Sequence, residues 1–376
     1  MNLEAALPAA DMEAIRAPFA AAGATAIDVP VIQPLGVLLD LTGEAMRARL
    51  FVVQADGGEE ACLRPDFTIA IARAHIADIA QGGAAKGRYI YEGKAFRAAP
   101  RGSHRAEEFL QIGLEAYGGG RSASADAEIV DLAWRASVAG GRADLSLVLG
   151  DASLFAAFVG ALGLNPALAA RMARGGARAV SPTASVAERQ GDRIAALLAG
   201  LPEAEACAVL EDLWSLSGIQ PVGGRSAAEI VHRLAARSQG AAAALTPTQA
   251  EQVEAFLAIE GPPREALAAM AKVAKAAGAD IAAPLADWSA RLDAFAAKGL
   301  PADRMILSTR FGRAFSYYDG FLFEVRCAAL GEDRPVAAGG RYDGLTKRLG
   351  AAKAGDGAVG CMVRPARAWS KSEPAE

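Results

Sequence analysis

The sequence is short of the residues that build metal centres and disulfide frameworks. Only four cysteines and three histidines occur among 376 residues. They are scattered along the chain: Cys62, Cys207, Cys327, Cys361, His75, His104 and His232. No two of them have the spacing of a zinc site, so the pattern indicates reduced, mostly buried thiols and ordinary histidines. We therefore expect no metal and no cofactor.

Long apolar runs and an excess of positive charge are also missing. No apolar run reaches transmembrane length, and residues 1–4 lack the basic start of a signal peptide, which predicts a cytoplasmic protein without membrane contact. The formal net charge of −4 argues against a broad nucleic-acid-binding face, although a local basic patch is compatible with it. Aromatic residues make up only 6%, and the length allows one large domain or two smaller ones.

The most informative stretch is a pair of alternating segments at residues 89–97 (YIYEGKAFR) and 108–117 (EFLQIGLEAY). Period-two alternation predicts two antiparallel strands of a hairpin. Gln111 and Glu115 are four residues apart, so on a strand they point to the same side. If Arg97 shares that face, the carboxylate, amide and guanidinium groups together can hold a zwitterion. The alternative is a surface hairpin with solvated charges.

Further segments accompany this hairpin: residues 64–68 (RPDFT), 313–324 (RAFSYYDGFLFE), 338–345 (AGGRYDGL) and 358–360 (AVG). In this order, and with the hairpin as motif 2, they resemble the motifs of histidyl-tRNA synthetases, a family of class II aminoacyl-tRNA synthetases. The resemblance covers nearly the whole chain and is weakest between about residues 150 and 302. It implies an α+β fold in which helices flank an antiparallel sheet.

The resemblance also implies a division of the chain. Residues 1–150 and 303–376 are expected to form a discontinuous synthetase-like core, and the Ala-rich residues 151–302 a mostly helical insertion. Hairpin-length turns join the motif strands, which predicts an antiparallel sheet of about six strands. Residues 26–30 (AIDVP) resemble motif 1, through which class II synthetases dimerise, so the chain is expected to pair with itself there. An ordinary helix–strand unit is the alternative.

A histidine-binding pocket follows from the same resemblance. Its expected ligands are Asp66, Thr68, Arg97, Gln111, Glu115, Arg313, Tyr317, Tyr318 and Tyr342. In the resembled family, groups matching Asp66 and Thr68 surround the α-ammonium, and the arginine matching Arg313 meets the carboxylate. We expect Gln111 to contact the α-ammonium as well. The second tyrosine of that family's pair, which matches Tyr318, contacts the imidazole, and we expect Glu115 to contact it too.

Each of these residues also has a structural alternative. Asp66 and Thr68 can cap the helix that apolar spacing predicts from residue 67 to residue 80. Asp66 is one methylene shorter than the family's glutamate, which favours a bridging water over a direct contact. Tyr317 and Tyr318 can be core aromatics, and Arg341 a charge at a helix end.

Three departures from the synthetase pattern bear on function. Residues 364–367 (RPAR) place Arg364 where a glycine leaves room for adenine, and Pro365 is expected to resist a helix there. Ala99 replaces an acidic residue of motif 2. No anticodon-binding domain follows within the sequence, so we expect no tRNA partner. Activation of histidine requires ATP held in line, and the sequence keeps only the histidine half of that machinery.

This combination resembles the regulatory subunits of ATP phosphoribosyltransferase, paralogues of the synthetases. The resemblance implies a non-catalytic chain that pairs with a short-form catalytic subunit in the first step of histidine biosynthesis and senses histidine for feedback. A sensor needs a partner whose states it biases. One alternative is an active ligase that adenylates histidine or an analogue, and another is a dimeric scaffold with a vestigial pocket.

Overall fold

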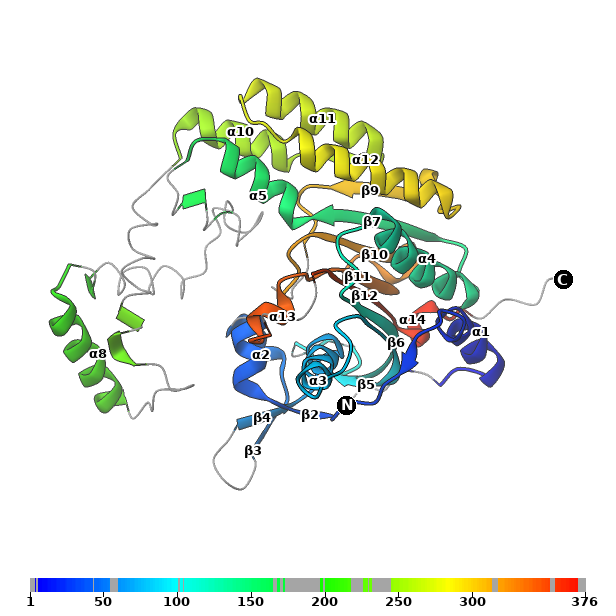
Figure 1. Cartoon of the computed structure of the whole chain (residues 1–376), viewed down its shortest axis with the longest axis horizontal. Coiled ribbons are helices and arrows are strands. Elements are labelled where there is room, and N and C mark those ends of the chain that lie inside the picture. Colours follow the sequence, from blue (N-terminus) through cyan, green and yellow to red (C-terminus); the bar gives the residue numbers. More distant parts are fainter. Residues whose placement is uncertain are drawn as a thin grey trace. The chain divides into compact units, whose positions relative to one another are not determined.

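The computed structural model (Figure 1) describes most of the chain. The described residues are 4, 6–42, 44–54, 60–100, 102–103, 105–164, 168–169, 172, 197–198, 200–217, 226–228, 230–231, 245–312, 317–351 and 356–370. The chain divides into two compact units. The first comprises Met1–Leu154, Ile259–Ala271 and Ala282–Glu376, and the second Phe155–Ala258 and Lys272–Ile281. The predicted domain limits at residues 150 and 303 stay a prediction.

Within the described part of the chain, one large sheet organises the first unit. Its strands are β1 (Thr25–Ala26), β5 (Gly87–Phe96), β6 (Glu108–Tyr117), β7 (Leu145–Asp151), β8 (Glu260–Gly261), β9 (Met305–Ser308), β10 (Phe321–Cys327), β11 (Ala337–Arg341) and β12 (Ala358–Val363). Their order is β1-β5-β6-β12-β11-β10-β7-β9-β8. Every pairing from β5 across to β7 is antiparallel, which confirms the predicted α+β class and its antiparallel motif strands.

The two edges of the sheet depart from the prediction. β1 pairs with β5 in parallel, and β7 pairs with β9 in parallel, so the complete sheet is mixed. Parallel neighbours need a long crossover rather than a hairpin turn, and more than a hundred and fifty residues separate the ends of β7 and the start of β9. The hairpin-length turns that predicted antiparallel order apply only to the strands between these edges.

The predicted hairpin is confirmed. β5 and β6 pair in antiparallel register, with Tyr89 opposite Glu115 and Gly93 opposite Gln111. Along β6, Ile112 and Leu114 are buried on one face of the sheet, and Gln111 and Glu115 therefore point to the other. Two segments far apart in the sequence thus lie side by side, since β12 pairs directly with β6 (Figure 1).

Helices cover both faces of this sheet. They are α1 (Ala9–Ala20), α2 (Leu35–Thr42), α3 (Thr68–Ala80), α4 (Ala123–Ala139), α12 (Ala282–Ala297), α13 (Leu345–Arg348) and α14 (Pro365–Ala368). α4 packs against β10, β11 and β12, with α1 and α12 beside it. The side chain of Ser122 caps α4 by accepting a hydrogen bond from the Ala125 amide at 3.2 Å, as expected for a serine N-cap.

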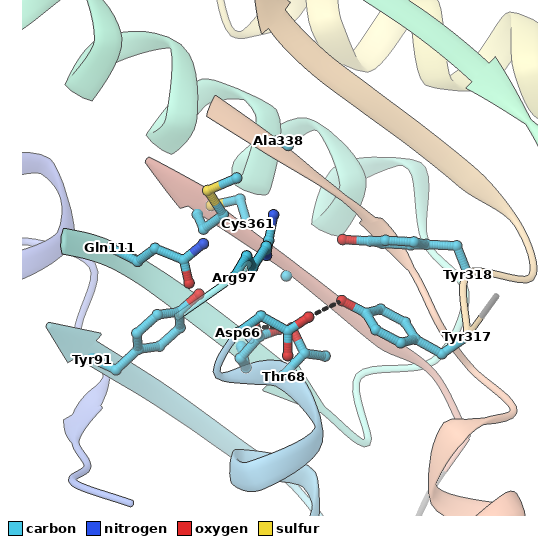
Figure 2. Close-up of a pocket in the computed structure, with 12 residues that line it drawn as sticks. Asp66, Thr68, Tyr91, Arg97, Gln111, Tyr317, Tyr318, Ala338 and Cys361 are labelled. Carbon is cyan, nitrogen blue, oxygen red and sulfur yellow. Dashed lines mark hydrogen bonds between the residues drawn. The ribbon is translucent and has the colours of Figure 1, made fainter. Parts of the chain in front are cut away.

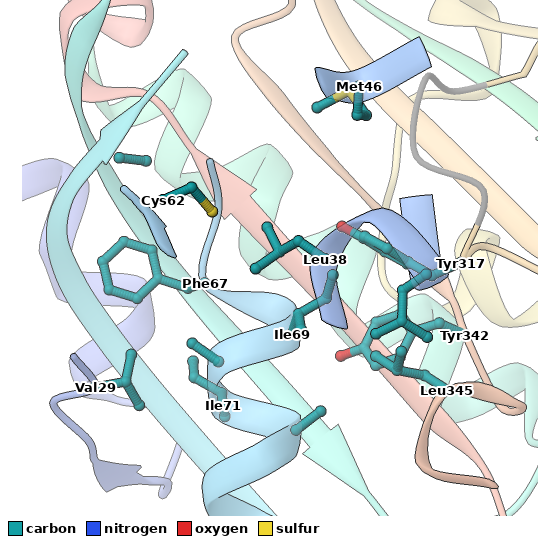
Figure 3. Packing of buried hydrophobic residues seen from close by; sticks show 14 of the residues in the cluster. Val29, Leu38, Met46, Cys62, Phe67, Ile69, Ile71, Tyr317, Tyr342 and Leu345 are labelled. Atoms are coloured by element: carbon teal, nitrogen blue, oxygen red, sulfur yellow. The ribbon is translucent and has the colours of Figure 1, made fainter. Parts of the chain in front are cut away.

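On the face of the large sheet opposite α4, a cluster of buried hydrophobic side chains lies next to the predicted site (Figure 3). Leu35 and Leu38 of α2 pack with Ile69 and Ile71 of α3, and the pocket tyrosines belong to the same buried cluster. Each fully buried Leu or Ile side chain contributes about 1.5–3 kcal/mol of transfer free energy. α3, whose first residue is Thr68, is therefore held firmly against the sheet.

The described residues hold further elements. A small sheet has the strand order β2-β4-β3, and the helices away from the large sheet include three 3₁₀ turns. These elements are β2 (Ile32–Pro34), β3 (Val52–Gln54), β4 (Glu60–Leu63), α5 (Ala152–Ala161), α8 (Glu203–Ser217), α10 (Pro247–Leu257), α11 (Pro263–Ala276), η1 (Glu44–Arg49), η4 (Ala302–Arg304) and η5 (Ala328–Leu330). In the second unit, Phe158 stacks on Phe256 with ring centroids 4.2 Å apart.

The described residues can be compared with the expectations about membrane contact and metal binding. Among these residues, no helix combines the length and apolar character that crossing a membrane requires. Nor do three or more His, Cys, Asp or Glu side chains gather there in a group that could hold a metal ion. His104 and His232 lie outside the described residues.

Candidate functional site

A polar pocket lies between the start of α3, strands β6 and β12, and the tyrosine pair (Figure 2). Seven of the predicted ligands line it: Asp66, Thr68, Arg97, Gln111, Glu115, Tyr317 and Tyr318. The pocket encloses about 300 Å³ including the solvent at its mouth, and its lining side chains leave little free space inside it. An amino-acid ligand therefore needs lining side chains to turn aside.

Asp66 and Thr68 are held by contacts across the pocket. The Tyr317 hydroxyl donates a hydrogen bond to Asp66 Oδ2 at 3.0 Å, and Thr68 Oγ1 donates to Glu115 Oε1 at 2.8 Å. The N-cap residue of α3 is Phe67, and no side chain caps the helix there. The N-cap position therefore belongs to neither Asp66 nor Thr68, and both side chains line the pocket.

Glu115 is the buried acid of the site. Its side chain is 2% exposed, and besides the bond from Thr68 it accepts a hydrogen bond from the Tyr342 hydroxyl at Oε2. Burial raises the pKa of Glu115 to about 8, against the lowering effect of these two hydroxyl donors. The nearby Asp66 carboxylate raises the pKa of Glu115 further. At neutral pH the protein alone therefore keeps a proton on this carboxyl group.

Gln111 carries the least satisfied group of the site. Its side chain is fully buried, and among the described residues neither its amide nitrogen nor its amide oxygen has a hydrogen-bonding partner. Buried side-chain amides are almost always hydrogen-bonded, because leaving one unpaired costs about 1–3 kcal/mol. A polar ligand in the pocket would supply the missing donor and acceptor.

Of the two other predicted ligands, Tyr342 does not line the pocket and Arg313 cannot be placed. Tyr342 lies behind Glu115, with its ring edge-on to Tyr317 at a centroid distance of 5.9 Å, so it contacts the acid rather than the open space. Arg313 lies outside the described residues, as does the rest of the segment 313–316. The expectation that Arg313 meets a carboxylate therefore stays a prediction.

Five lining residues were not among the predicted ligands: Tyr91, Ala338, Gly360, Cys361 and Met362. The period-two pattern that carries Tyr89 also places Tyr91 on the pocket face, and this signal could have identified it. Gly360 pairs with Glu115 across β12 and β6. A Cβ atom at Gly360 would lie 1.8 Å from Glu115 Oε2, so only glycine leaves room for the buried carboxyl group.

A cluster of arginines lies beside the pocket. The buried Arg364 guanidinium covers the ring of Phe109 at 3.7 Å from its centroid and pairs with Glu4. Burial and the charge of Arg364 lower the pKa of Arg367 to about 9. Our expectation that Pro365 resists a helix is wrong, because it occupies the first position of α14, where a missing N–H costs nothing.

The chain is similar throughout its length to proteins of one kind. The family model described as Histidyl-tRNA synthetase matches residues 4–221 and 207–363. A Brucella anthropi protein named ATP phosphoribosyltransferase regulatory subunit is 35% identical over 336 residues, which cover 87% of this chain and 88% of that protein. A Brucella canis protein of the same name is 34% identical and covers 91% of this chain and 92% of its own length.

Solved structures reproduce the fold at lower identity. The crystal structure of an ATP phosphoribosyltransferase regulatory subunit/histidyl-tRNA synthetase from Bacillus halodurans aligns with a TM-score of 0.63 at 20% identity, covering 99% of this chain and 83% of that one. A histidyl-tRNA synthetase from Nostoc aligns with a TM-score of 0.59 at 16% identity, covering 97% of this chain and 74% of that one. These alignments place the nine-stranded sheet in the class II synthetase fold.

Proposed function

The chain belongs to the family of ATP phosphoribosyltransferase regulatory subunits, and from this premise we propose that its polar pocket binds free histidine for feedback. A regulatory subunit is not itself the transferase. It acts by binding its ligand with different affinity in the two states of the enzyme that it regulates. The partner we propose is a short-form catalytic ATP phosphoribosyltransferase subunit, which performs the first step of histidine biosynthesis.

The buried side-chain amide of Gln111 is the main support for the proposal that the pocket binds histidine. Its buried amide lacks partners among the described residues and lines a pocket together with two carboxyl groups. A donor of several hydrogens, such as an α-ammonium group, would pair with the Gln111 amide oxygen and the Asp66 carboxylate. Few free metabolites combine that ammonium with a ring whose nitrogens can bond to a buried acid.

The other end of the pocket suits an imidazole. A Glu115 carboxyl group that keeps its proton to about pH 8 can donate to a neutral imidazole nitrogen or pair with an imidazolium. Tyr318 lines the pocket as well, and we propose that it contacts the second ring nitrogen. Arg313 would meet the ligand's carboxylate. The side chains at the mouth then have to turn to admit the ligand.

Titration calorimetry on the purified chain tests this proposal. Histidine is expected to bind more tightly than histidinol, which lacks the carboxylate, and more tightly than histamine, which has only the amine and the ring. Glutamine, whose side chain has no ring nitrogen, is the matched amino-acid control and is expected not to bind. Absence of histidine binding at millimolar concentration would contradict the proposal and leave the pocket as a vestige.

The alternative is a ligase that adenylates histidine. Arg364 stands where the resembled synthetases have the glycine that leaves room for adenine, and its buried guanidinium lies over the ring of Phe109. Ala99 stands where motif 2 of those enzymes has an acidic residue. We propose that the chain supports neither histidine-dependent ATP–pyrophosphate exchange nor aminoacylation of tRNA, even after Arg364→Gly and Ala366→Glu. Exchange by the wild-type chain would overturn this, with an authentic histidyl-tRNA synthetase as the positive control.

A further inference from the structure

Tyr342 stands between two residues that are both held by ionic contacts. Arg341 Nε lies 2.6 Å from Asp126 Oδ1, and Arg341 Nη1 lies 3.0 Å from Asp343 Oδ1. The side chains of Arg341 and Asp126 are 3% and 1% exposed, so this is an interior ion pair. We call Arg341 and Asp343, on either side of Tyr342, the 341–343 clamp.

The clamp ties the end of β11 to two other segments. The Arg341 guanidinium donates hydrogen bonds to the carbonyl oxygens of Gly120 at 3.2 Å and Ser122 at 3.3 Å, just before α4. Asp343 Oδ1 also accepts a hydrogen bond from the Ala358 amide at 2.7 Å, at the start of β12. Its other oxygen pairs with Arg121 at 2.7 Å. Both neighbours of Tyr342 are therefore fixed by several contacts each.

The fixed backbone places the Tyr342 hydroxyl group against one oxygen of the Glu115 carboxyl group. The Tyr342 amide donates to the Ala358 carbonyl at 3.0 Å, and its hydroxyl donates to Glu115 Oε2. Thr68 occupies the other carboxyl oxygen, so two hydroxyls from different elements set the orientation of Glu115. Tyr342 does not line the pocket itself. Its hydroxyl group therefore acts on a ligand through Glu115, while its ring packs against Tyr317 and Tyr318.

We propose that Arg341 and Asp343 are positioning residues for histidine recognition, because they hold the Tyr342 hydroxyl on Glu115. This inference rests on the proposed histidine site. A carboxyl group pinned by two hydroxyls presents itself to an imidazole in one orientation, so less freedom is lost on binding. The competing explanation is an ion cluster that only stabilises the fold, and a binding measurement separates the two.

The experiment is a double-mutant cycle on histidine affinity, measured by titration calorimetry. Tyr342→Phe removes the hydroxyl, and Arg341→Met removes the guanidinium with little change of volume. Each is expected to weaken histidine binding by about 10- to 100-fold, the value of a hydrogen bond to an ionisable group. The double variant is expected to bind no more weakly than Tyr342→Phe alone, because Arg341 acts through that hydroxyl.

Arg291→Met is the matched control. Arg291 Nε contacts the other oxygen of the same Asp126 carboxylate at 2.7 Å, and among the described residues no hydrogen bond or ion pair joins Arg291 to Arg341 or Asp343. This variant is expected to lower thermal stability and to leave histidine affinity within about twofold, since surface and core changes away from the site act through folding. If Arg341→Met does not fold, Asp343→Asn replaces it in the cycle.

Three results overturn the inference, and they distinguish a failed clamp from a failed histidine site. If Arg341→Met, or Asp343→Asn in its place, lowers affinity by the same factor with and without the Tyr342 hydroxyl, the clamp is only structural while the histidine site stands. The clamp is likewise only structural if the Arg291→Met control loses affinity as strongly. If the wild-type chain does not bind histidine at all, the proposed function fails, and the clamp has no ligand to serve.

Discussion

At the scale of single residues, Glu115 concentrates the energetics of the pocket. It is buried, bonded to two hydroxyls, and close to a second carboxyl group. Truncating one partner of a buried charged hydrogen bond costs about 2–5 kcal/mol. We expect Glu115→Ala to weaken histidine binding by about one to three orders of magnitude in calorimetry.

Glu108→Ala is the control for this variant. Glu108 lies on the same strand and pairs with Lys94 outside the pocket. Surface pairs of this kind contribute about 0–1 kcal/mol, so histidine affinity is expected to stay unchanged. Equal affinity of Glu115→Ala and the wild type would remove Glu115 from the set of ligands.

The raised pKa of Glu115 predicts a bell-shaped dependence of histidine affinity on pH. Free imidazole holds its proton below about pH 6.5, and Glu115 in the protein alone holds its proton below about pH 8. We infer that the complex shares one proton between them. Between these two pH values the separate partners carry that one proton, so affinity is highest. Below about pH 6.5 both partners carry a proton, so binding must release one. Above about pH 8 neither partner carries a proton, so binding must take one up.

Calorimetry across pH 5.5 to 9 checks this, with a decline of about tenfold per pH unit expected outside the window. Glu115→Gln has no titrating group and is expected to bind more weakly but without the alkaline decline. A wild-type affinity that stays constant from pH 8 to pH 9 would contradict a shared proton.

At the scale of elements, the family resemblance predicted the fold class and most of the pocket residues, and local periodicity predicted the hairpin. Gln111 and Glu115 are predicted to share one face because side chains on a strand repeat every two residues, and the structure brings both to the pocket. The position of Tyr342 behind Glu115 depends on the pairing of β6 with β12. That register joins residues more than two hundred positions apart, and no local pattern encodes it.

The same limit applies where the helices begin. Asp66 and Thr68 resemble caps because short polar residues precede an apolar run, but a distant carboxyl group and a distant tyrosine bind their side chains. Pro365 resembles a helix breaker, whereas at the first helical position it is tolerated. Distant tertiary partners determine the contacts of Asp66 and Thr68. The position of Pro365 within its helix determines that it is tolerated there.

The segment that resembles motif 1 carries a prediction at this scale. It runs into β2, where Ile32 is 57% exposed, and β1 is an edge of the large sheet. We propose that the surface through which two copies pair is formed by this segment, from β1 at the edge of the large sheet to β2 of the small sheet. Ile32→Asp is expected to convert a dimer to a monomer in sedimentation velocity, because a buried charge opposes association.

Ile306→Asp is the matched control, since Ile306 is an exposed isoleucine on β9, away from that edge. It is expected to leave the sedimentation coefficient unchanged. A dimer that persists in Ile32→Asp would locate the contact elsewhere, and a monomeric wild type would end the proposal of self-pairing.

At the scale of the whole molecule, sensing and assembly should be separable. The pocket residues lie between α3 and the sheet, and most are buried, so we do not expect them to form the surface for the catalytic subunit. Complexes reconstituted with Glu115→Ala are therefore expected to assemble and to retain basal transferase activity while losing the response to histidine. A variant complex that responds at the same histidine concentration as the wild type would refute the sensor role of this pocket.

The strand order of the large sheet has a consequence for how the protein is made. β12 lies in the middle of the sheet between β6 and β11, although it is the last strand of the described residues. During synthesis β6 therefore keeps an open edge until residues 358–363 have emerged, and such distant pairings slow folding. Gly360, which completes the wall around Glu115, arrives on that same strand. The pocket that we propose for histidine therefore cannot form before β12 has been made and has paired with β6, more than two hundred residues after the hairpin.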